Sequence, residues 1–249
     1  MATFYPPIDW TEHPLHAAAM SGNRIRVKRL IAEGANLNEL LNLDVNGRQD
    51  VAGAPLHVAI LNCRDDVQLY RGHHEVVEVL LAAGANVHLC RMWEGTPLHD
   101  AARFGLTRIA DLLISYGADV SSKGDYQDRT PLHLAAVTGQ RNMVDFLLSK
   151  GAKIDAIAGG EDQTDPATSL YWRQYSGSLE RRLSRSIGET PLQMAANEGH
   201  VDVVKTLIKR GACLGVGTAI DLAARSRSRC ETRFNSVITL LEERQQSGT

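Results

Sequence analysis

Histidine recurs at one position of a repeated tetrapeptide, and its imidazole is well suited to bind a metal ion or to transfer a proton. The tetrapeptide ends in Pro-Leu-His, and its four histidines are His16, His57, His99 and His133. Two histidines share a zinc ion only when their ring nitrogens lie within roughly 3–4 Å of each other. Copies that lie one structural repeat apart do not approach so closely, so we expect no metal and no cofactor here.

Asp100 is the one carboxylate that this pattern places directly beside a histidine. It follows His99, and Arg103 lies three residues further on. That spacing is more typical of an ion pair at the protein surface than of a general acid or base. The chain carries no motif for phosphate binding, dinucleotide binding, zinc proteolysis or serine hydrolysis. We therefore predict no catalytic residue and keep Asp100 and Arg103 as candidates for binding.

The composition fits a folded intracellular protein, cytoplasmic or nuclear. Hydrophobic residues make up 43% of the 249 residues, and the net charge of −2 gives no overall attraction to nucleic acid or to an anionic membrane. No apolar run reaches the roughly eighteen residues of a membrane span, and the first residues, MATFYPPIDW, do not resemble a secretory signal. The four cysteines fit neither a zinc knuckle nor a disulfide framework, which indicates reduced thiols.

A basic stretch near the C-terminus could be mistaken for a nucleic-acid site. Its arginines are Arg225, Arg227, Arg229 and Arg233. They lack interleaved aromatic side chains, which favours a solvated surface. Nucleic acid and membranes are therefore not expected as partners.

The tetrapeptide belongs to a longer repeated pattern. Thr-Pro-Leu-His or a close variant begins at residues 13, 54, 96, 130 and 190, and a degenerate copy begins at 218. Alanines follow each copy, and in four copies a Gly-Ala pair comes twenty residues after the proline. This pattern resembles the ankyrin repeat family over roughly residues 10–244. The resemblance implies an all-α solenoid of about six helix-turn-helix repeats with β-hairpin fingers between them.

Local chemistry agrees with helix pairs. Threonine before proline is typical of a helix N-cap, and glycine in a left-handed conformation is typical of a helix end. The glycines expected to end the second helices are Gly34, Gly84, Gly117, Gly151 and Gly211. One helix pair cannot bury both of its faces, so the copies must stack.

The resemblance also assigns the histidines a structural role. It implies that each repeated imidazole hydrogen-bonds the backbone of its own or the next repeat. His74 is expected to occupy the family's usual Gly-His position before the second helix, as His200 does.

Irregular spacing divides the single domain, residues 1–249, into repeats and insertions. The expected repeats are residues 10–44, 52–92, 93–126, 127–157, 188–214 and 215–244. The expected insertions are residues 39–50, 64–72 and 156–187, the last a long one between repeats four and five. Insertions are expected in loops because a longer loop costs little entropy, whereas an insertion in a helix would disrupt the stack.

Aromatic and arginine side chains near the fingers form the predicted binding surface, since such residues often anchor interfaces. With Met92 and the carboxylate Asp100 added, the predicted residues on the groove are Met92, Trp93, Asp100, Arg103, Phe104 and Tyr126. In the long insertion they are Tyr171, Trp172 and Tyr175. The alternative is that these aromatic residues only pack against neighbouring fingers.

Two classes of function remain open at this stage. The first is a non-enzymatic module that binds a partner protein or peptide through its concave groove and the long insertion. The alternative is a small-molecule-binding or catalytic protein whose pocket is closed by residues 156–187. A closed pocket would need inward-facing aromatic residues above an ionisable residue.

Two further features are predicted outside the groove. Residues 235–244 carry apolar residues on one side and are expected to form a capping helix, with residues 245–249 disordered. Asn38 stands where ankyrin proteins are hydroxylated by an asparaginyl hydroxylase, so the resemblance makes it a candidate modification site.

Overall fold

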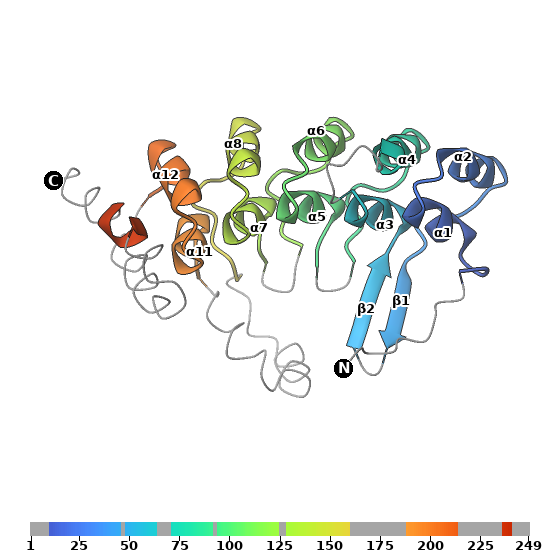
Figure 1. Cartoon of the computed structure of the whole chain (residues 1–249), viewed down its shortest axis with the longest axis horizontal. Helices are drawn as coiled ribbons and strands as arrows, with labels where there is room; N and C mark the ends of the chain where they lie inside the picture. The colour runs from blue at the N-terminus through green and yellow to red at the C-terminus, as the bar shows by residue number, and fades with distance from the viewer. Residues whose placement is uncertain are drawn as a thin grey trace. The chain divides into compact units, whose positions relative to one another are not determined.

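The computed structural model describes residues 10–45, 48–63, 71–91, 94–124, 128–159, 188–213 and 236–240. They form two compact units, and the division between them falls within the helix Pro97–Arg103. The first unit contains the residues up to 101 together with residues 106–125. The second unit contains residues 102–105 together with those from 126 onward. Both units are built from antiparallel helix pairs (Figure 1).

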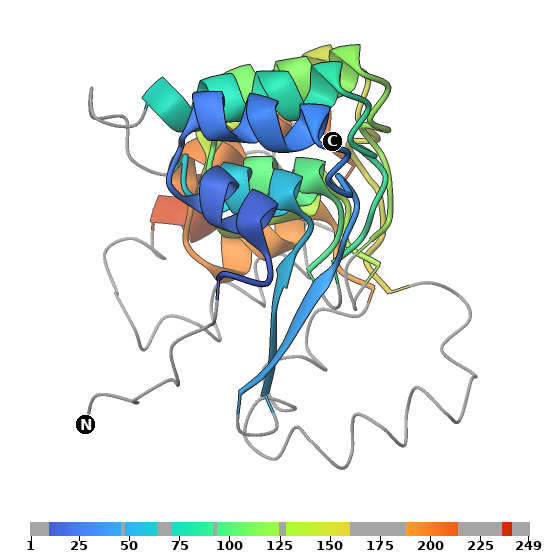
Figure 2. The same ribbon diagram turned by 90° about the vertical axis from the view of Figure 1, so that its right-hand side faces the viewer.

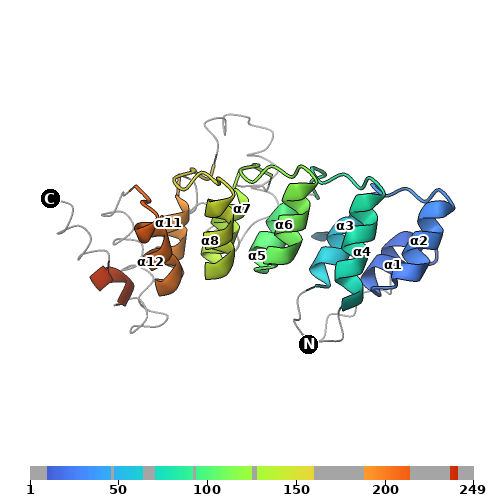
Figure 3. The ribbon, with the colours of Figure 1, turned by 90° about the horizontal axis from the view of Figure 1, so that it is seen from above.

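In the part that the structure describes, the first unit holds three helix pairs and one β-hairpin. The pairs are α1 (Pro14–Met20) with α2 (Arg24–Ala32), α3 (Pro55–Leu61) with α4 (Arg71–Ala82), and α5 (Pro97–Arg103) with α6 (Thr107–Ser115). The first helices, α1, α3 and α5, form one row, and the second helices, α2, α4 and α6, form another above it (Figures 1 and 3).

Among its described residues, the second unit repeats this arrangement with two helix pairs. These are α7 (Pro131–Val137) with α8 (Arg141–Ser149), and α11 (Pro191–Asn197) with α12 (Val201–Lys209). Here α7 packs on α11, and α8 packs on α12. Residues 236–240, within the predicted capping helix, are helical, and Val237 among them is fully buried. The predicted disordered end, residues 245–249, and the degenerate sixth copy lie outside the described residues.

The ends of the helices follow the predicted chemistry. Thr130 and Thr190 are N-caps in extended conformation, and each is followed by proline at the first helical position. The five glycines predicted to end the second helices all have positive φ, from 88° to 94°. Both predictions from the repeat pattern are therefore confirmed.

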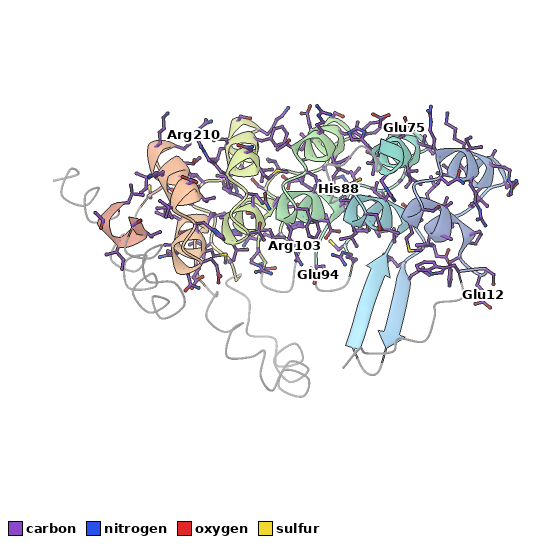
Figure 4. The ribbon with its side chains drawn as sticks, viewed as in Figure 1. Glu12, Glu75, His88, Glu94, Arg103 and Arg210 are labelled. Carbon is purple, nitrogen blue, oxygen red and sulfur yellow. The ribbon has the colours of Figure 1, made fainter. Side chains whose placement is uncertain are left out.

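The core is a layer of leucine, alanine and valine between the two rows of helices. The alanine pairs within the first helices are fully buried, as at Ala18 and Ala19 in the first unit and Ala135 and Ala136 in the second. Small side chains at these positions allow neighbouring helices to approach closely. Ion pairs link successive second helices at the surface. Arg24 of α2, for example, lies 3.2 Å from Glu75 of α4, which Figure 4 labels. Such exposed pairs contribute little stability.

A β-hairpin stands between α2 and α3. Strand β1 (Leu41–Val45) pairs antiparallel with β2 (Arg48–Gly53), with an irregularity between Leu41 and Asn42. The hairpin projects away from the helices of its unit (Figure 2). It occupies most of the expected first insertion, residues 39–50, and extends to Gly53.

The other two expected insertions are described only in part. In the second, residues 64–70 lie outside the described residues, and α4 already begins at Arg71. In the third, residues 160–187 lie outside them. Ala158 is fully buried and exchanges backbone hydrogen bonds with Gly188 and Glu189, at 2.7 and 3.0 Å. The two ends of the long insertion are therefore held side by side.

Within the described part of the chain, no helix combines the length and the apolar character needed to cross a membrane.

Candidate functional site

The repeated histidines are buried and bonded to backbone. His133 donates from Nε2 to the carbonyl of Glu189 at 3.2 Å, which joins the repeat containing α7 to the repeat containing α11. On its other side, Nδ1 accepts from the backbone N–H of Thr130 at 3.1 Å and faces the Thr130 hydroxyl at 2.9 Å. His99 and Thr96 make the same pair of contacts at 3.1 and 2.8 Å. The structural role that the family resemblance implied is confirmed for these histidines.

His57 shows how strongly this position favours the neutral imidazole. It is fully buried, and its Nδ1 accepts from the backbone N–H of Ala54 at 3.3 Å. Burial, together with the nearby positive charge of Arg91, lowers the pKa of His57 to about 3. A histidine in this state serves as a neutral hydrogen-bonding group near pH 7, not as a proton carrier.

The prediction that His74 occupies the Gly-His position was wrong by one residue. His73 is the buried histidine, and its Nε2 donates to the carbonyl of Met20 at 2.8 Å. His200 makes the equivalent bond to the carbonyl of Val137 at 3.0 Å. His74 is part-exposed and faces Glu78 one helical turn away at 3.4 Å. Gly72-His73 aligns with Gly199-His200, and the adjacent second histidine concealed this alignment.

Asp100 is buried, so its expected place in a surface ion pair was wrong. Its side chain is fully enclosed, and the guanidinium of Arg91 donates to both carboxylate oxygens, from Nε at 3.1 Å and from Nη2 at 2.6 Å. Arg91 is itself only 9% exposed, and its Nη2 lies 3.7 Å from Glu94. Such a two-pronged pair fixes the finger before α5 against the helix.

The sequence did contain a signal for this burial. In the other copies with a histidine, the residue after it is apolar: Ala17, Val58 and Leu134. In the copy that starts at residue 190, Gln193 replaces the histidine and is followed by the apolar Met194. A carboxylate at such a position requires a cationic partner. Arg91 was missed because the finger brings it back over the helix, which spacing along the chain does not reveal.

Glu189 is a second buried carboxyl that the sequence did not single out. Its side chain is 6% exposed, and neither carboxylate oxygen has a hydrogen-bond partner among the described residues. Burial, together with the negative charge of Glu198, raises the pKa of Glu189 to about 7. Glu189 therefore changes protonation near neutral pH, at the point where the long insertion returns to the repeats.

The remaining predicted binding residues are only partly described. Arg103, the last residue of α5, and the following Phe104 are both half-buried, and Figure 4 shows Arg103 on this helix and Glu94 on the preceding finger. The other candidates, Met92, Trp93, Tyr126, Tyr171, Trp172 and Tyr175, lie outside the described residues. A single surface formed by all of them thus stays a prediction.

Asn38 links two successive fingers. Its side-chain oxygen accepts from the backbone N–H of Asn86 at 2.8 Å, and its own N–H donates to the side chain of Asn36 at 3.0 Å. Asn38 is also exposed. Its hydroxylation stays a prediction, at a residue that already makes a structural contact.

The described cysteines Cys63, Cys90 and Cys213 are free. Burial raises the pKa of the Cys63 thiol to about 11, which keeps it protonated. That the thiols are reduced stays a prediction.

Comparison with known proteins gives the same picture as the geometry. The family described as ankyrin repeats in three copies matches residues 67–158, and the single ankyrin repeat matches residues 12–42 and 187–219. The crystal structure of the human ASB11 ankyrin repeat domain is 26% identical, with a TM-score of 0.63 over 93% of this chain and 83% of that one.

Curated relatives share the repeats over part of their length. Mouse "Ankyrin repeat and SOCS box protein 5" is 34% identical over 110 residues, which is 44% of this chain and 28% of that protein. Rice "Probable E3 ubiquitin-protein ligase XBOS33" is 31% identical over 206 residues, which is 80% of this chain and 31% of that protein. The chain therefore spans less than a third of either relative. The matched repeats cover more than half of its residues, and the chain belongs to the ankyrin repeat family.

Proposed function

We propose that this protein-interaction module binds a partner protein or peptide through its first helices, its fingers and the long insertion. The observation that supports this most directly is the state of the chemically capable side chains. His99, His133 and Asp100 are fully enclosed and bonded within or between repeats. They stabilise the scaffold, which leaves recognition to side chains at its surface.

Arg103 and Phe104 are the described residues best suited to contact the partner. Arginine and aromatic side chains are frequent anchors of protein interfaces, because each can bury a large area against a partner. Both are half-buried, so each retains accessible surface. The aromatic residues of the long insertion, Tyr171, Trp172 and Tyr175, would extend this surface.

The relatives suggest a class of partner. One is named as an ankyrin repeat and SOCS box protein and another as a probable E3 ubiquitin-protein ligase. We therefore propose that the bound protein belongs to a ubiquitin-ligase assembly, as a component or as a protein presented to it.

The test is quantitative affinity purification from cells with matched variants. Proteins captured by the wild-type chain are compared with those captured by Arg103→Glu and Phe104→Ala. Ile25→Ser is the control, because Ile25 is 81% exposed on the second helix α2. We expect one set of captured proteins, including ligase components, to be lost with Arg103→Glu and with Phe104→Ala and to be retained with Ile25→Ser. Equal capture by all of the folded variants would contradict the proposal.

A second candidate function rests on Glu189. A small-molecule pocket closed by the insertion would need an ionisable group beneath it, and Glu189 is a buried carboxyl without a described hydrogen-bond partner at the root of that insertion. A ligand with a basic nitrogen would complete its hydrogen bonding. A crystal structure of the full chain distinguishes the two: a cavity enclosed by residues 160–187 above Glu189 favours the pocket, and an insertion lying away from Glu189 excludes it.

A further inference from the structure

Three potential metal ligands meet at the start of the first repeat. The ring nitrogens of His13 and His16 and a carboxylate oxygen of Glu39 all lie within 4.8 Å of one another. His13 Nδ1 is 3.3 Å from Glu39 Oε1, and His16 Nδ1 is 4.0 Å from Glu39 Oε2. The His16 side chain is fully buried, whereas that of Glu39 is 43% exposed, so the cluster is open to solvent on one side.

In the first repeat, Nδ1 of His16 lacks the hydrogen bonds that Nδ1 of the equivalent histidine makes in later repeats. In two later repeats, Nδ1 of His99 and of His133 is bonded by the threonine that precedes the proline. In the first repeat that threonine is replaced by His13, whose φ of −126° and ψ of 61° depart from the extended N-cap. Nδ1 of His16 and Nδ1 of His13 are both enclosed and make no hydrogen bond with a described residue.

The other ring nitrogen sets the tautomer of His16. Nε2 lies 3.0 Å from the carbonyl of Glu39 and 3.2 Å from the carbonyl of Gly53, and carbonyls only accept. Nε2 therefore carries the proton, and the lone pair of Nδ1 faces His13 and Glu39. Burial lowers the pKa of His16, which also favours this neutral form. Metal-binding histidines are commonly oriented in this way, by a backbone carbonyl on the second nitrogen.

We propose that His13, His16 and Glu39 form a site for a divalent transition-metal ion of the zinc class. Two imidazole nitrogens and one carboxylate oxygen suit zinc, with water in a fourth position. Bonds of about 2.0–2.1 Å in a tetrahedron place the ligand atoms about 3.3–3.4 Å apart. The His13–Glu39 distance already meets this value, and the other ligands need to move by about 1 Å or somewhat more. This site differs from a zinc ion shared between the repeated histidines, which we do not expect. Of the repeated histidines only His16 belongs to the site, and its partners there are His13 and Glu39.

The bound ion would stabilise the end of the array. It would join the start of α1 to the finger segment that leads into β1, since Glu39 lies two residues before Leu41. A metal that binds only the folded chain raises its stability in proportion to the logarithm of metal concentration. The site therefore holds the first finger in place without a catalytic role.

The test uses the full chain, stripped of metal and with its cysteines alkylated, titrated with Zn²⁺ and with Co²⁺. His13→Thr removes one ligand and restores the threonine of the later repeats, so it should fold. Glu39→Gln is a second variant that removes the carboxylate. His74→Ala is the control, because His74 also faces a glutamate at 3.4 Å but lies outside the cluster.

We expect one Zn²⁺ per chain, a higher melting temperature with Zn²⁺, and a Co²⁺ absorption spectrum typical of tetrahedral nitrogen and oxygen ligands. His13→Thr and Glu39→Gln should each weaken binding by at least about tenfold, and His74→Ala should leave it unchanged. Absence of stoichiometric binding to the wild-type chain, or binding retained in both ligand variants, would overturn the proposal. So would an equal loss in the His74→Ala control.

Discussion

Burial and the nearest polar groups together determine the surroundings of the buried carboxyl groups of Asp100 and Glu189. Asp100 is fully enclosed but receives two hydrogen bonds from Arg91, so its charge is balanced. Glu189 is almost as buried, and its carboxyl oxygens lack a hydrogen-bond partner among the described residues; burial and the charge of Glu198 raise the pKa of Glu189 to about 7. Two carboxyl groups of similar exposure thus have different surroundings: Asp100 is bonded to a guanidinium, whereas no described residue forms a hydrogen bond with the carboxyl of Glu189.

The first prediction concerns the Arg91–Asp100 pair. Arg91→Ala leaves the buried Asp100 carboxylate uncompensated, which should lower the free energy of unfolding by about 3–5 kcal/mol in denaturant titrations. Removing both charges with Arg91→Met and Asp100→Leu should restore most of this loss, since no unpaired charge remains. If the double variant is no more stable than Arg91→Ala, the cost does not come from an uncompensated charge.

The second prediction is a pH dependence centred on Glu189. Its folded pKa of about 7 lies above the ordinary value of 4.5, so the folded chain binds more protons than the unfolded chain between these values. The contribution of Glu189 to stability is therefore complete below about pH 4.5 and is lost as the pH rises through 7. Glu189→Gln should be more stable than the wild type at pH 8, by roughly 1–3 kcal/mol, and should lose this pH dependence.

Thermal unfolding of both chains at several pH values measures this difference. Glu198→Gln serves as a companion variant, because it removes the charge that helps to raise the pKa of Glu189. Its effect should be smaller, since burial is the larger cause. Parallel stability curves for the wild type and Glu189→Gln from pH 5 to 8 would show that Glu189 does not titrate in this range.

At the scale of the helix, a threonine, a proline and a histidine or glutamine make one capping unit. In the α7 repeat His133 accepts from the Thr130 N–H, and in the α11 repeat the Gln193 side-chain oxygen accepts from the Thr190 N–H at 2.9 Å. Glutamine and histidine can thus satisfy the same backbone donor. The chain itself contains a functional substitute for the histidine.

This substitution yields the third prediction. His133→Ala removes the acceptor for Thr130 and the donor to Glu189, and should destabilise the protein by roughly 1–3 kcal/mol. His133→Gln should retain the capping bond and lose less stability. Differential scanning calorimetry of the two variants makes the comparison, and equal losses would mean that the capping bond contributes little.

The helices could be predicted from the sequence because their signals are local. Proline at the first helical position and glycine after the second helix mark both ends of each pair, and the structure confirms them. The site could be predicted less well, because its contacts join residues that only the fold brings together. Arg91 reaches Asp100 across a finger turn, and Glu39 reaches His13 across a whole helix pair. The assignment of His74 to the Gly-His position failed for a different reason, since two adjacent histidines fit one motif.

At the scale of the whole molecule, a stacked array of repeats must cover, at its ends, the apolar surface that inner repeats bury against each other. Among the described C-terminal residues, Val237 is fully buried within the helical segment 236–240. Deletion of residues 234–249 should therefore lower the melting temperature and promote aggregation, measured by circular dichroism and light scattering. An unchanged melting temperature would show that this segment does not cap the stack.

The measurement that tests the account most directly is the affinity of a partner, identified by the affinity purification, for a chain without its long insertion. Because Ala158 pairs with Gly188 and Glu189, residues 160–187 can be replaced by a short Asn-Gly turn that joins ends already side by side. The account predicts an unchanged circular dichroism spectrum and a large loss of partner affinity in isothermal titration calorimetry. Full affinity in the shortened chain would contradict a role for the insertion and assign recognition to the regular repeats alone.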